Sequence, residues 1–383
     1  LVGSTKNYYE NHLEPDVVIS LGGVTGDYDC FKKLSNSVKK NLEVWRVNTD
    51  GNIIDTYGKL TAVFQMRIED FFASGVQLDA CIIGTPDNLH FDLTHRAMNN
   101  GWSVLLEKPM AQTADECRSI AEAAERTGAL VSVCYVLRYH PYFMKIRELS
   151  QRPQMGAIVS VSHTERVGND RTAHTYVRGP WNVAEMDTTV FLSKCCHDVD
   201  FVLWLIGNDV KSVRSTGTAN HFRPENAPEG AAARCLDCKF ESQCRYSAVD
   251  LYVRRKDWIK GFVPVAGESH DDAVMRALKE SRYGRCVYDC PTNDALDHQV
   301  VEVEMTSGIK AEIVMECPTE EDNRVTRIEF ENAVLEGDER IITVTYKDGR
   351  ESEKYDFSFM LDSYRTTLSL DPMMKLLSSC DYS

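Results

Sequence analysis

Short apolar segments alternate with amphipathic ones along the first third of the chain, and this alternation restricts the fold more than any other feature. The apolar segments have the length and composition of strands buried in a parallel sheet. They cover residues 17–19, 42–47, 80–83, 104–106 and 130–135, and helical periodicity separates them at 31–40, 68–74, 91–99 and 113–126. The pattern predicts an α/β, doubly wound sheet of the Rossmann type over residues 1–142.

The pattern changes after Pro141, where a second domain, 143–383, is expected to combine helices with antiparallel strands. The strands are predicted at 157–166, 210–218, 300–305, 309–315, 325–335 and 341–346. A glycine-bearing turn at Gly308 joins two of them as a hairpin. A long apolar segment at 190–206, followed by Gly207, predicts a mostly buried helix.

Composition excludes several classes of partner. The chain has 383 residues and a formal net charge of −15, which argues against nucleic acid and against an anionic membrane surface. No apolar run reaches the roughly 20 residues that span a bilayer. Several of the thirteen cysteines lie in apolar or helical contexts, which favours a reducing compartment and predicts a cytoplasmic protein.

The strongest chemical signal is Glu107-Lys108-Pro109, directly after the predicted strand at 104–106. Ligands of open α/β sheets bind at the carboxyl ends of the strands, so Lys108 lies where a ligand is expected. Pro109 biases Lys108 toward extended backbone. An ammonium presented there can hold a substrate hydroxyl or move a proton.

A glycine-bearing turn at 20–26 follows the first predicted strand and could approach a pyrophosphate. Its pattern departs from G-x-G-x-x-G, because Ser20 and Thr25 stand where glycine is expected, while Gly22, Gly23 and Gly26 are retained. These three glycines are the predicted phosphate contacts. The alternative is a glycine turn that binds no phosphate.

A group that holds the ribose hydroxyls is expected after the second strand. Asp50 is the acidic candidate, although the register leaves Asn48 or Thr49 nearer the usual place.

Four motifs follow one another along the chain. They are Thr85-Pro86 with Asn88 and His90, Glu107-Lys108-Pro109, Arg138 with Pro141, and His197-Asp198-Val199-Asp200. In this order they resemble the Gfo/Idh/MocA family, the glucose–fructose oxidoreductase and inositol 2-dehydrogenase group. The resemblance covers roughly residues 17 to 345.

The resemblance implies NAD or NADP as cofactor and a carbohydrate or cyclitol as substrate. It implies a mostly antiparallel open sheet in the second domain, with one face over the active site and the other often used to form a homo-oligomer (dimer or tetramer). The residues implied to line the nicotinamide end of the cofactor are Thr85, Pro86, Asn88 and His90. Glu107 and Lys108 are implied to lie beside the reacting carbon, and Arg138 near the nicotinamide ribose.

The predicted helix at 190–206 carries the second catalytic candidate. Lys194, His197 and Phe201 fall on one stripe of it. A histidine suits proton abstraction as hydride leaves, so His197 is the predicted general base. Family members often carry aspartate where this chain has Ser193, which makes Lys194 the candidate partner of His197.

The loop before this helix offers His174, Arg178 and Trp181. Residues of these types bind hydroxylated rings by aromatic stacking and by bidentate hydrogen bonds, so we predict that this loop lies on the substrate side of the active site.

Cysteines gather later in the chain. Cys235, Cys238 and Cys244 follow C-x2-C-x5-C, and Cys286 and Cys290 come about forty residues later. Such thiolates can close a structural zinc site, and free thiols or a local disulfide are the alternatives.

The leading hypothesis is an NAD(P)-dependent oxidoreductase that acts on a secondary alcohol of a sugar, glycoside or cyclitol. Two alternatives remain. One is a glycosidase that oxidises and re-reduces its substrate with a retained cofactor. The other is a degenerate, non-catalytic protein that binds a sugar or a partner.

Overall fold

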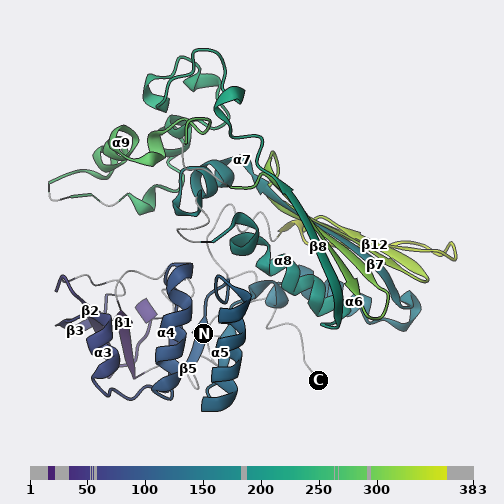
Figure 1. Ribbon diagram of the computed structural model, residues 1–383, viewed down its shortest axis with the longest axis horizontal. Coiled ribbons are helices and arrows are strands. Elements are labelled where there is room, and N and C mark those ends of the chain that lie inside the picture. Colours follow the sequence, from purple (N-terminus) through teal and green to yellow (C-terminus); the bar gives the residue numbers. More distant parts are fainter. Residues whose placement is uncertain are drawn as a thin grey trace. The chain divides into compact units, whose positions relative to one another are not determined.

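The computed structural model describes residues 16–21, 34–51, 53, 55, 58–182, 188–262, 264–265, 267–290 and 295–359. The chain divides into two compact units between Cys134 and Tyr135, and the second unit ends at Ser358 (Figure 1). The sequence analysis placed this boundary after Tyr142. Within the described residues, no helix is both long and apolar enough to cross a membrane.

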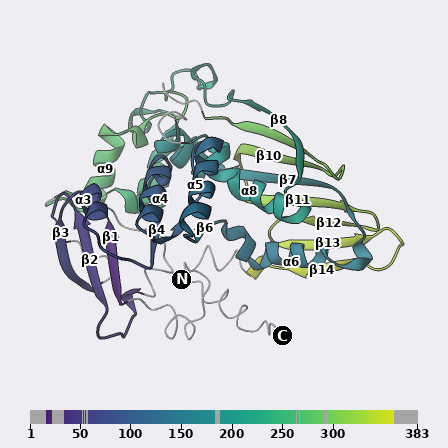
Figure 2. The same cartoon turned by 60° about the horizontal axis from the view of Figure 1, so that its bottom comes forward.

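The first unit contains two parallel, three-stranded sheets with helices beside them, and the predicted Rossmann-like architecture is confirmed (Figure 2). The first sheet has the order β1 (Val17–Leu21), β2 (Glu43–Asn48), β3 (Leu60–Gln65). The second has the order β4 (Ala80–Ile83), β5 (Ser103–Leu106), β6 (Val131–Val133). The helices are α3 (Ile68–Ala73), α4 (His90–Asn99) and α5 (Ala114–Thr127). β3 was not predicted.

The first unit is built around a core in which Trp102 stacks on Phe72, with ring centroids 5.3 Å apart. Local signals fix the ends of α5. Thr113 accepts from the backbone N–H of Glu116, whose carboxylate accepts from the N–H of Thr113, which is the predicted capping box. Gly128, with φ 72°, ends the helix in the left-handed region that glycine tolerates.

The second unit contains an eight-stranded sheet in the order β14-β13-β12-β11-β7-β10-β9-β8. Only β7 and β10 pair in parallel, so the expectation of a mostly antiparallel sheet is confirmed. The strands are β7 (Ile158–Gly168), β8 (Val210–Thr218), β9 (His298–Met305), β10 (Lys310–Thr319), β11 (Asn323–Phe330), β12 (Ala333–Gly337), β13 (Ile341–Tyr346) and β14 (Glu353–Asp356). The segment predicted as one strand at 325–335 is two strands, and β14 was not predicted.

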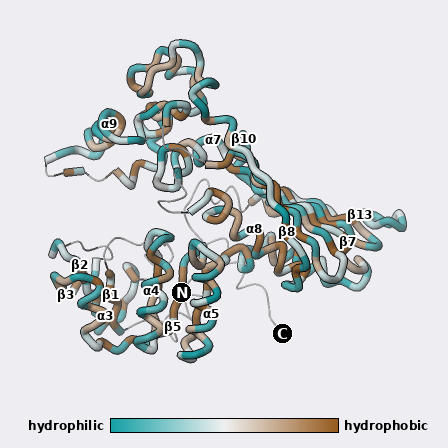
Figure 3. The backbone as a smooth tube through the Cα atoms, viewed as in Figure 1, coloured by the Kyte–Doolittle hydropathy of each residue, from teal (hydrophilic) through white to brown (hydrophobic). Residues whose placement is uncertain are grey.

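Two helices, α6 (Pro141–Ser150) and α8 (Val190–Ile206), lie along one face of this sheet (Figure 1). Thr189 caps α8 through the N–H of Leu192, and Gly207, with φ 98°, follows its last turn as predicted. The ring of Phe201 on α8 packs edge-on against Phe143 of α6, with centroids 4.8 Å apart. In Figure 3 hydrophilic and hydrophobic residues alternate along the strands, as expected for a sheet with one buried face.

A lobe inserted between β8 and β9 contains short helical turns and α9 (His270–Glu280). One small apolar core lies within it, around Tyr252 and Leu278. A second, around Phe222 and Tyr246, also includes Ala173 and Val177 from the segment before α8.

Candidate functional site

In the first unit, the loops that follow β4 and β5 carry candidate site residues. The two strands are parallel neighbours, so their carboxyl ends open at the same edge of the sheet. The first loop carries Thr85 and Pro86, and the second carries Glu107 and Lys108. The Lys108–Pro109 peptide bond is cis.

The side chain of His90 contacts the backbone of both loops. Its ring is fully buried, with Nδ1 2.7 Å from the carbonyl oxygen of Pro109 and Nε2 3.0 Å from that of Thr85. The resemblance implied a place for His90 beside the cofactor. The structure instead places the ring inside the unit, where it braces the loop that carries Lys108.

A cavity of about 290 Å³ lies at the carboxyl ends of β2 and β3. It is lined by Asn48, Thr49, Met66, Arg67, Ile68 and Glu69. Asp50 is exposed and lies 3.6 Å from Arg46. The residue at the end of β2 is therefore Asn48, and Asp50 lies two positions beyond it.

These features fit a nicotinamide dinucleotide. The cavity is at the edge of the sheet where such ligands bind. The hydroxyl of Thr85 is buried and has no hydrogen-bond partner among the described residues. Asn88 is exposed in the turn that follows β4. The glycines Gly22, Gly23 and Gly26 lie outside the described residues.

In the second unit, the candidate catalytic residues lie on α8. His197 is half-buried, and its ring stands edge-on to that of Tyr135, with centroids 6.2 Å apart. Lys194, one turn earlier, is also half-buried. Ser193 is buried and donates through its hydroxyl to the carbonyl of Val190.

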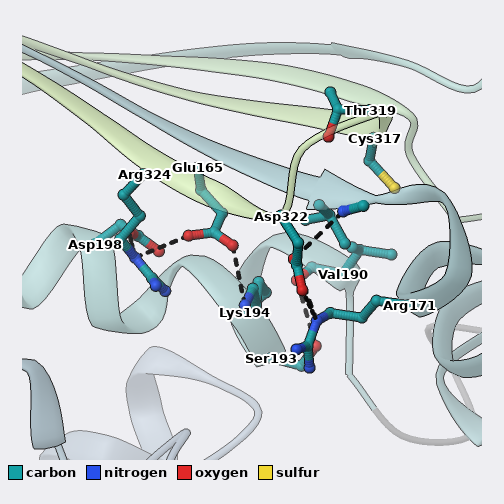
Figure 4. A network of polar contacts seen from close by, with 12 residues as sticks. Glu165, Arg171, Val190, Ser193, Lys194, Asp198, Cys317, Thr319, Asp322 and Arg324 are labelled. Atoms are coloured by element: carbon teal, nitrogen blue, oxygen red, sulfur yellow. Dashed lines mark hydrogen bonds and ion pairs between the residues drawn. The ribbon is translucent and has the colours of Figure 1, made fainter. Parts of the chain in front are cut away.

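Charged residues under α8 form a buried network that the sequence analysis missed (Figure 4). The Nζ atom of Lys194 is 2.9 Å from Oε1 of Glu165, and Oε2 of Glu165 is 2.8 Å from Nε of Arg324. The same Nε is 2.6 Å from Oδ1 of Asp198. His163 reaches that carboxylate with Nε2 at 2.9 Å.

The two carboxyls of this network respond differently to their surroundings. Burial raises the pKa of Glu165 to about 7, against the opposing effect of Arg324 and Lys194. Burial also acts to raise the pKa of Asp198, but Arg324 and His163 outweigh it and hold that pKa below its usual range.

One signal in the sequence could have revealed these residues. Along β7 the inward positions are Val161, His163, Glu165 and Val167. Burying two ionisable side chains on the inward face of a strand costs free energy unless each has a partner of opposite charge or a hydrogen-bond partner. Their presence therefore indicates buried partners elsewhere in the chain.

Arg138, implied to lie near the nicotinamide ribose, has a partner in its own unit. Its guanidinium donates two hydrogen bonds to Asp200, at 2.8 and 2.7 Å, and lies over the ring of Trp204. Arg138 therefore connects its turn to α8.

The predicted substrate-side loop faces the inserted lobe. Arg178 is 1% exposed and donates to the carbonyl oxygens of Arg285 and Tyr246. His174 is 2.8 Å from the hydroxyl of Tyr252, and burial, Arg178 and Arg171 lower its pKa to about 4.

Trp181 packs beside the buried cluster around Val167 and Tyr176. Arg178 and His174 thus anchor the lobe, and their role in binding substrate stays a prediction.

The predicted zinc site is not supported. Among the described residues, no three histidine, cysteine, aspartate or glutamate side chains converge as metal ligands. Cys235 and Cys238, like every other described cysteine, are free thiols. Burial raises the pKa of Cys244 and Cys286, and raises that of Cys290 to about 11.

Comparison with known proteins supports the assignment of the first unit. Residues 48–135 match the family described as "Oxidoreductase family, NAD-binding Rossmann fold". Inositol 2-dehydrogenase of Rhizobium meliloti is 27% identical over 40% of this chain and 44% of its own length. D-xylose 1-dehydrogenase (NADP(+)) 2 of Haloferax volcanii is 35% identical over 22% of this chain and 26% of its own length. The chain thus aligns with less than half the length of these curated relatives.

Solved structures extend the similarity of fold to both units. The inositol dehydrogenase homologue of Azotobacter vinelandii, complexed with NAD+, superposes with a TM-score of 0.57. The superposition covers 93% of this chain and 78% of that one, at 12% identity. Residues 48–135 thus match the NAD-binding Rossmann segment of the Gfo/Idh/MocA oxidoreductases, and the fold of both units is similar to that of the solved inositol dehydrogenase homologue.

Proposed function

We propose that this protein is an NAD(P)-dependent dehydrogenase that oxidises a secondary alcohol of a sugar or cyclitol. One observation carries the proposal. The segment that matches the NAD-binding family ends its strands in two neighbouring loops, one with the unpartnered hydroxyl of Thr85 and the other with Lys108. Relatives that align with this segment are named inositol 2-dehydrogenase and D-xylose 1-dehydrogenase, which supports a polyhydroxylated substrate.

The bound nicotinamide would accept the hydride, and the protein would supply orientation and proton transfer. In this proposal Lys108 holds the substrate hydroxyl, and His197 takes its proton as general base. Lys194 provides a positive charge one turn from His197 on the same helix. Glu107, Pro86 and Asn88 are proposed to border the nicotinamide, as the family resemblance implies.

The test is oxidation of myo-inositol, scyllo-inositol and D-xylose with NAD+ and NADP+, followed by the absorbance of the reduced cofactor. Lys108→Met and His197→Ala are expected to lower kcat by about 100-fold or more. Two exposed residues of the second unit provide matched controls, Lys211→Met and His298→Ala, which should leave kcat unchanged. Equal activity in the catalytic and control variants would contradict the assignment.

A further inference from the structure

Two charged residues of α8 hold this helix against the sheet, and they stand on either side of His197 in the sequence. Lys194 is bound by Glu165 of β7, and Asp198 is bound by Arg324 of β11 and His163 of β7. The carboxylate of Glu165 also contacts Arg324, so it links the two attachments. The rotation of α8 about its own axis, and with it the direction of the turn that carries His197, is thereby fixed.

Stability alone does not account for this network. Glu165 and Asp198 are 1% and 0% exposed, and such ions lose their hydration on folding. Apolar side chains of similar volume commonly hold a helix on a sheet as well as a buried ion pair does. A charged arrangement at this place therefore points to a role in the chemistry of the adjoining residues.

Lys194 is the member of the network that reaches toward solvent. Its side chain is 18% exposed, whereas that of Arg324 is 11% exposed and also contacts Glu339. An ammonium has three donors, and the contact with Glu165 accounts for one of them. Asp322 pairs with Arg171 at 2.9 Å, and the positive charges of Arg171 and Lys194 both act to lower the pKa of its carboxyl group (Figure 4).

We propose that Glu165 is a positioning residue of the dehydrogenase site, which holds the ammonium of Lys194 on the stripe of α8 that carries His197. The held cation orients the substrate hydroxyl and keeps a second positive charge beside the proton acceptor. This inference rests on the proposed function. It adds a residue on a sheet strand to a site whose other members come from loops and from α8.

The ionisation of Glu165 makes the arrangement sensitive to pH. Because burial raises its pKa to about 7, Glu165 is charged and binds Lys194 at pH 8. As the pH falls below this pKa, Glu165 becomes protonated, and its attraction for Lys194 weakens. The groups that face the pair are Arg324, Asp322, and Asp198 with its partner His163. Asp198 and Asp322 are acids with lowered pKa values and Arg324 is a guanidinium, so the charges of these three do not change between pH 6 and pH 8.

Competitive acetylation of the intact protein tests the contact without any need for activity. Acetic anhydride at pH 8, read by peptide mass spectrometry, compares Lys194 with Lys211. Lys211 is held in an exposed pair with Glu304 on the same sheet. In Glu165→Gln the acetylation rate of Lys194 relative to Lys211 is expected to rise about tenfold, because the amine is no longer held in an ion pair with a buried carboxylate and is freer to meet the reagent. In Glu304→Gln the ratio should not rise. An unchanged ratio in Glu165→Gln would overturn the proposal.

Kinetics then separate a positioning role from a purely structural one. On the substrate found in the panel above, Glu165→Gln should lower kcat at pH 8 about tenfold with little change in KM. The acid limb of kcat/KM should move to lower pH, because removal of a negative charge weakens proton binding nearby. Lys194→Met should cause a similar loss, and the double variant should lose no more than either single one.

Additive losses, or an acid limb at the same pH as in Glu304→Gln, would show that Glu165 acts elsewhere. A wild-type protein that binds cofactor but oxidises none of the three alcohols would contradict the proposed function instead. The acetylation ratio would still decide whether Glu165 holds Lys194.

Discussion

The buried ring of His90 lies 2.7 Å from the carbonyl oxygen of Pro109, so the residue after the candidate catalytic lysine is fixed from the inside of the Rossmann unit. The other ring nitrogen faces Thr85, the residue with the unpartnered hydroxyl. One side chain therefore sets the separation of the two loops that we propose to border the nicotinamide.

His90→Gln is expected to destabilise the protein by about 2 kcal/mol, because at least one buried carbonyl loses its donor. Displacement of the loop should also lower kcat/KM by about tenfold to 100-fold. His95→Gln, on the same helix, removes a ring whose Nε2 lies 3.2 Å from the hydroxyl of Ser119 and is the matched control. Thermal unfolding and steady-state kinetics of both variants check this. Similar values for the two variants would show that His90 does not brace the loops.

Arg324→Met should be strongly destabilising, by about 3–5 kcal/mol, since it leaves Glu165 and Asp198 buried without their shared cation. Arg327 on the same strand pairs with Glu329 and Glu336 at the surface, and Arg327→Met should cost less than about 1 kcal/mol. Urea unfolding of both variants gives the comparison. A cost below 1 kcal/mol for Arg324→Met would mean that the network is not formed.

The raised pKa of Glu165 predicts how stability depends on pH. The folded protein holds this proton more tightly than the unfolded chain, in which the pKa is near the ordinary 4.5, so the stabilising effect is complete below pH 4.5 and is lost as the pH rises through about 7. Between pH 5 and 8, wild type should therefore lose on the order of 2 kcal/mol relative to Glu165→Gln. Glu304→Gln should not show this trend, because Lys211 lowers the pKa of Glu304. A flat difference between wild type and Glu165→Gln would contradict the assignment.

The cavity at the ends of β2 and β3 predicts which residue selects the cofactor. A carboxylate at the end of β2 would accept hydrogen bonds from a ribose diol and repel a 2′-phosphate. Asn48→Asp should therefore raise the Kd for NADPH relative to NADH by at least about tenfold. Asp50→Asn tests the alternative that Asp50 holds the ribose, in which case this variant would change the ratio and Asn48→Asp would not.

Local sequence signals were sufficient for much of the fold. The capping box at Thr113 and the apolar run before Gly207 correctly placed α5 and α8. β3 was missed because Thr61 and Gln65 interrupt its apolar character, and β14 because its charged residues pair only at the edge of the sheet. The order of strands in the second sheet depends on contacts between distant segments, which one sequence does not contain.

The candidate site divides in the same way. The motifs around Thr85, Lys108 and His197 are local, and the sequence was enough to find them. Glu165 and Arg324 are neighbours only because β11 pairs with β7 in one particular register. Arg178 was predicted to face substrate from its residue type, but the lobe that buries it comes from residues about 60 to 110 positions later.

Cofactor binding tests the central claim most directly. Purified protein should be titrated with NADH and with NADPH while the fluorescence of the reduced nicotinamide is followed, after its absorbance has been checked for cofactor already bound. We expect saturable binding of at least one of them with a micromolar or lower Kd, and weaker binding after Thr85→Val. If neither nucleotide binds to a folded protein that carries no cofactor, the dehydrogenase proposal is wrong.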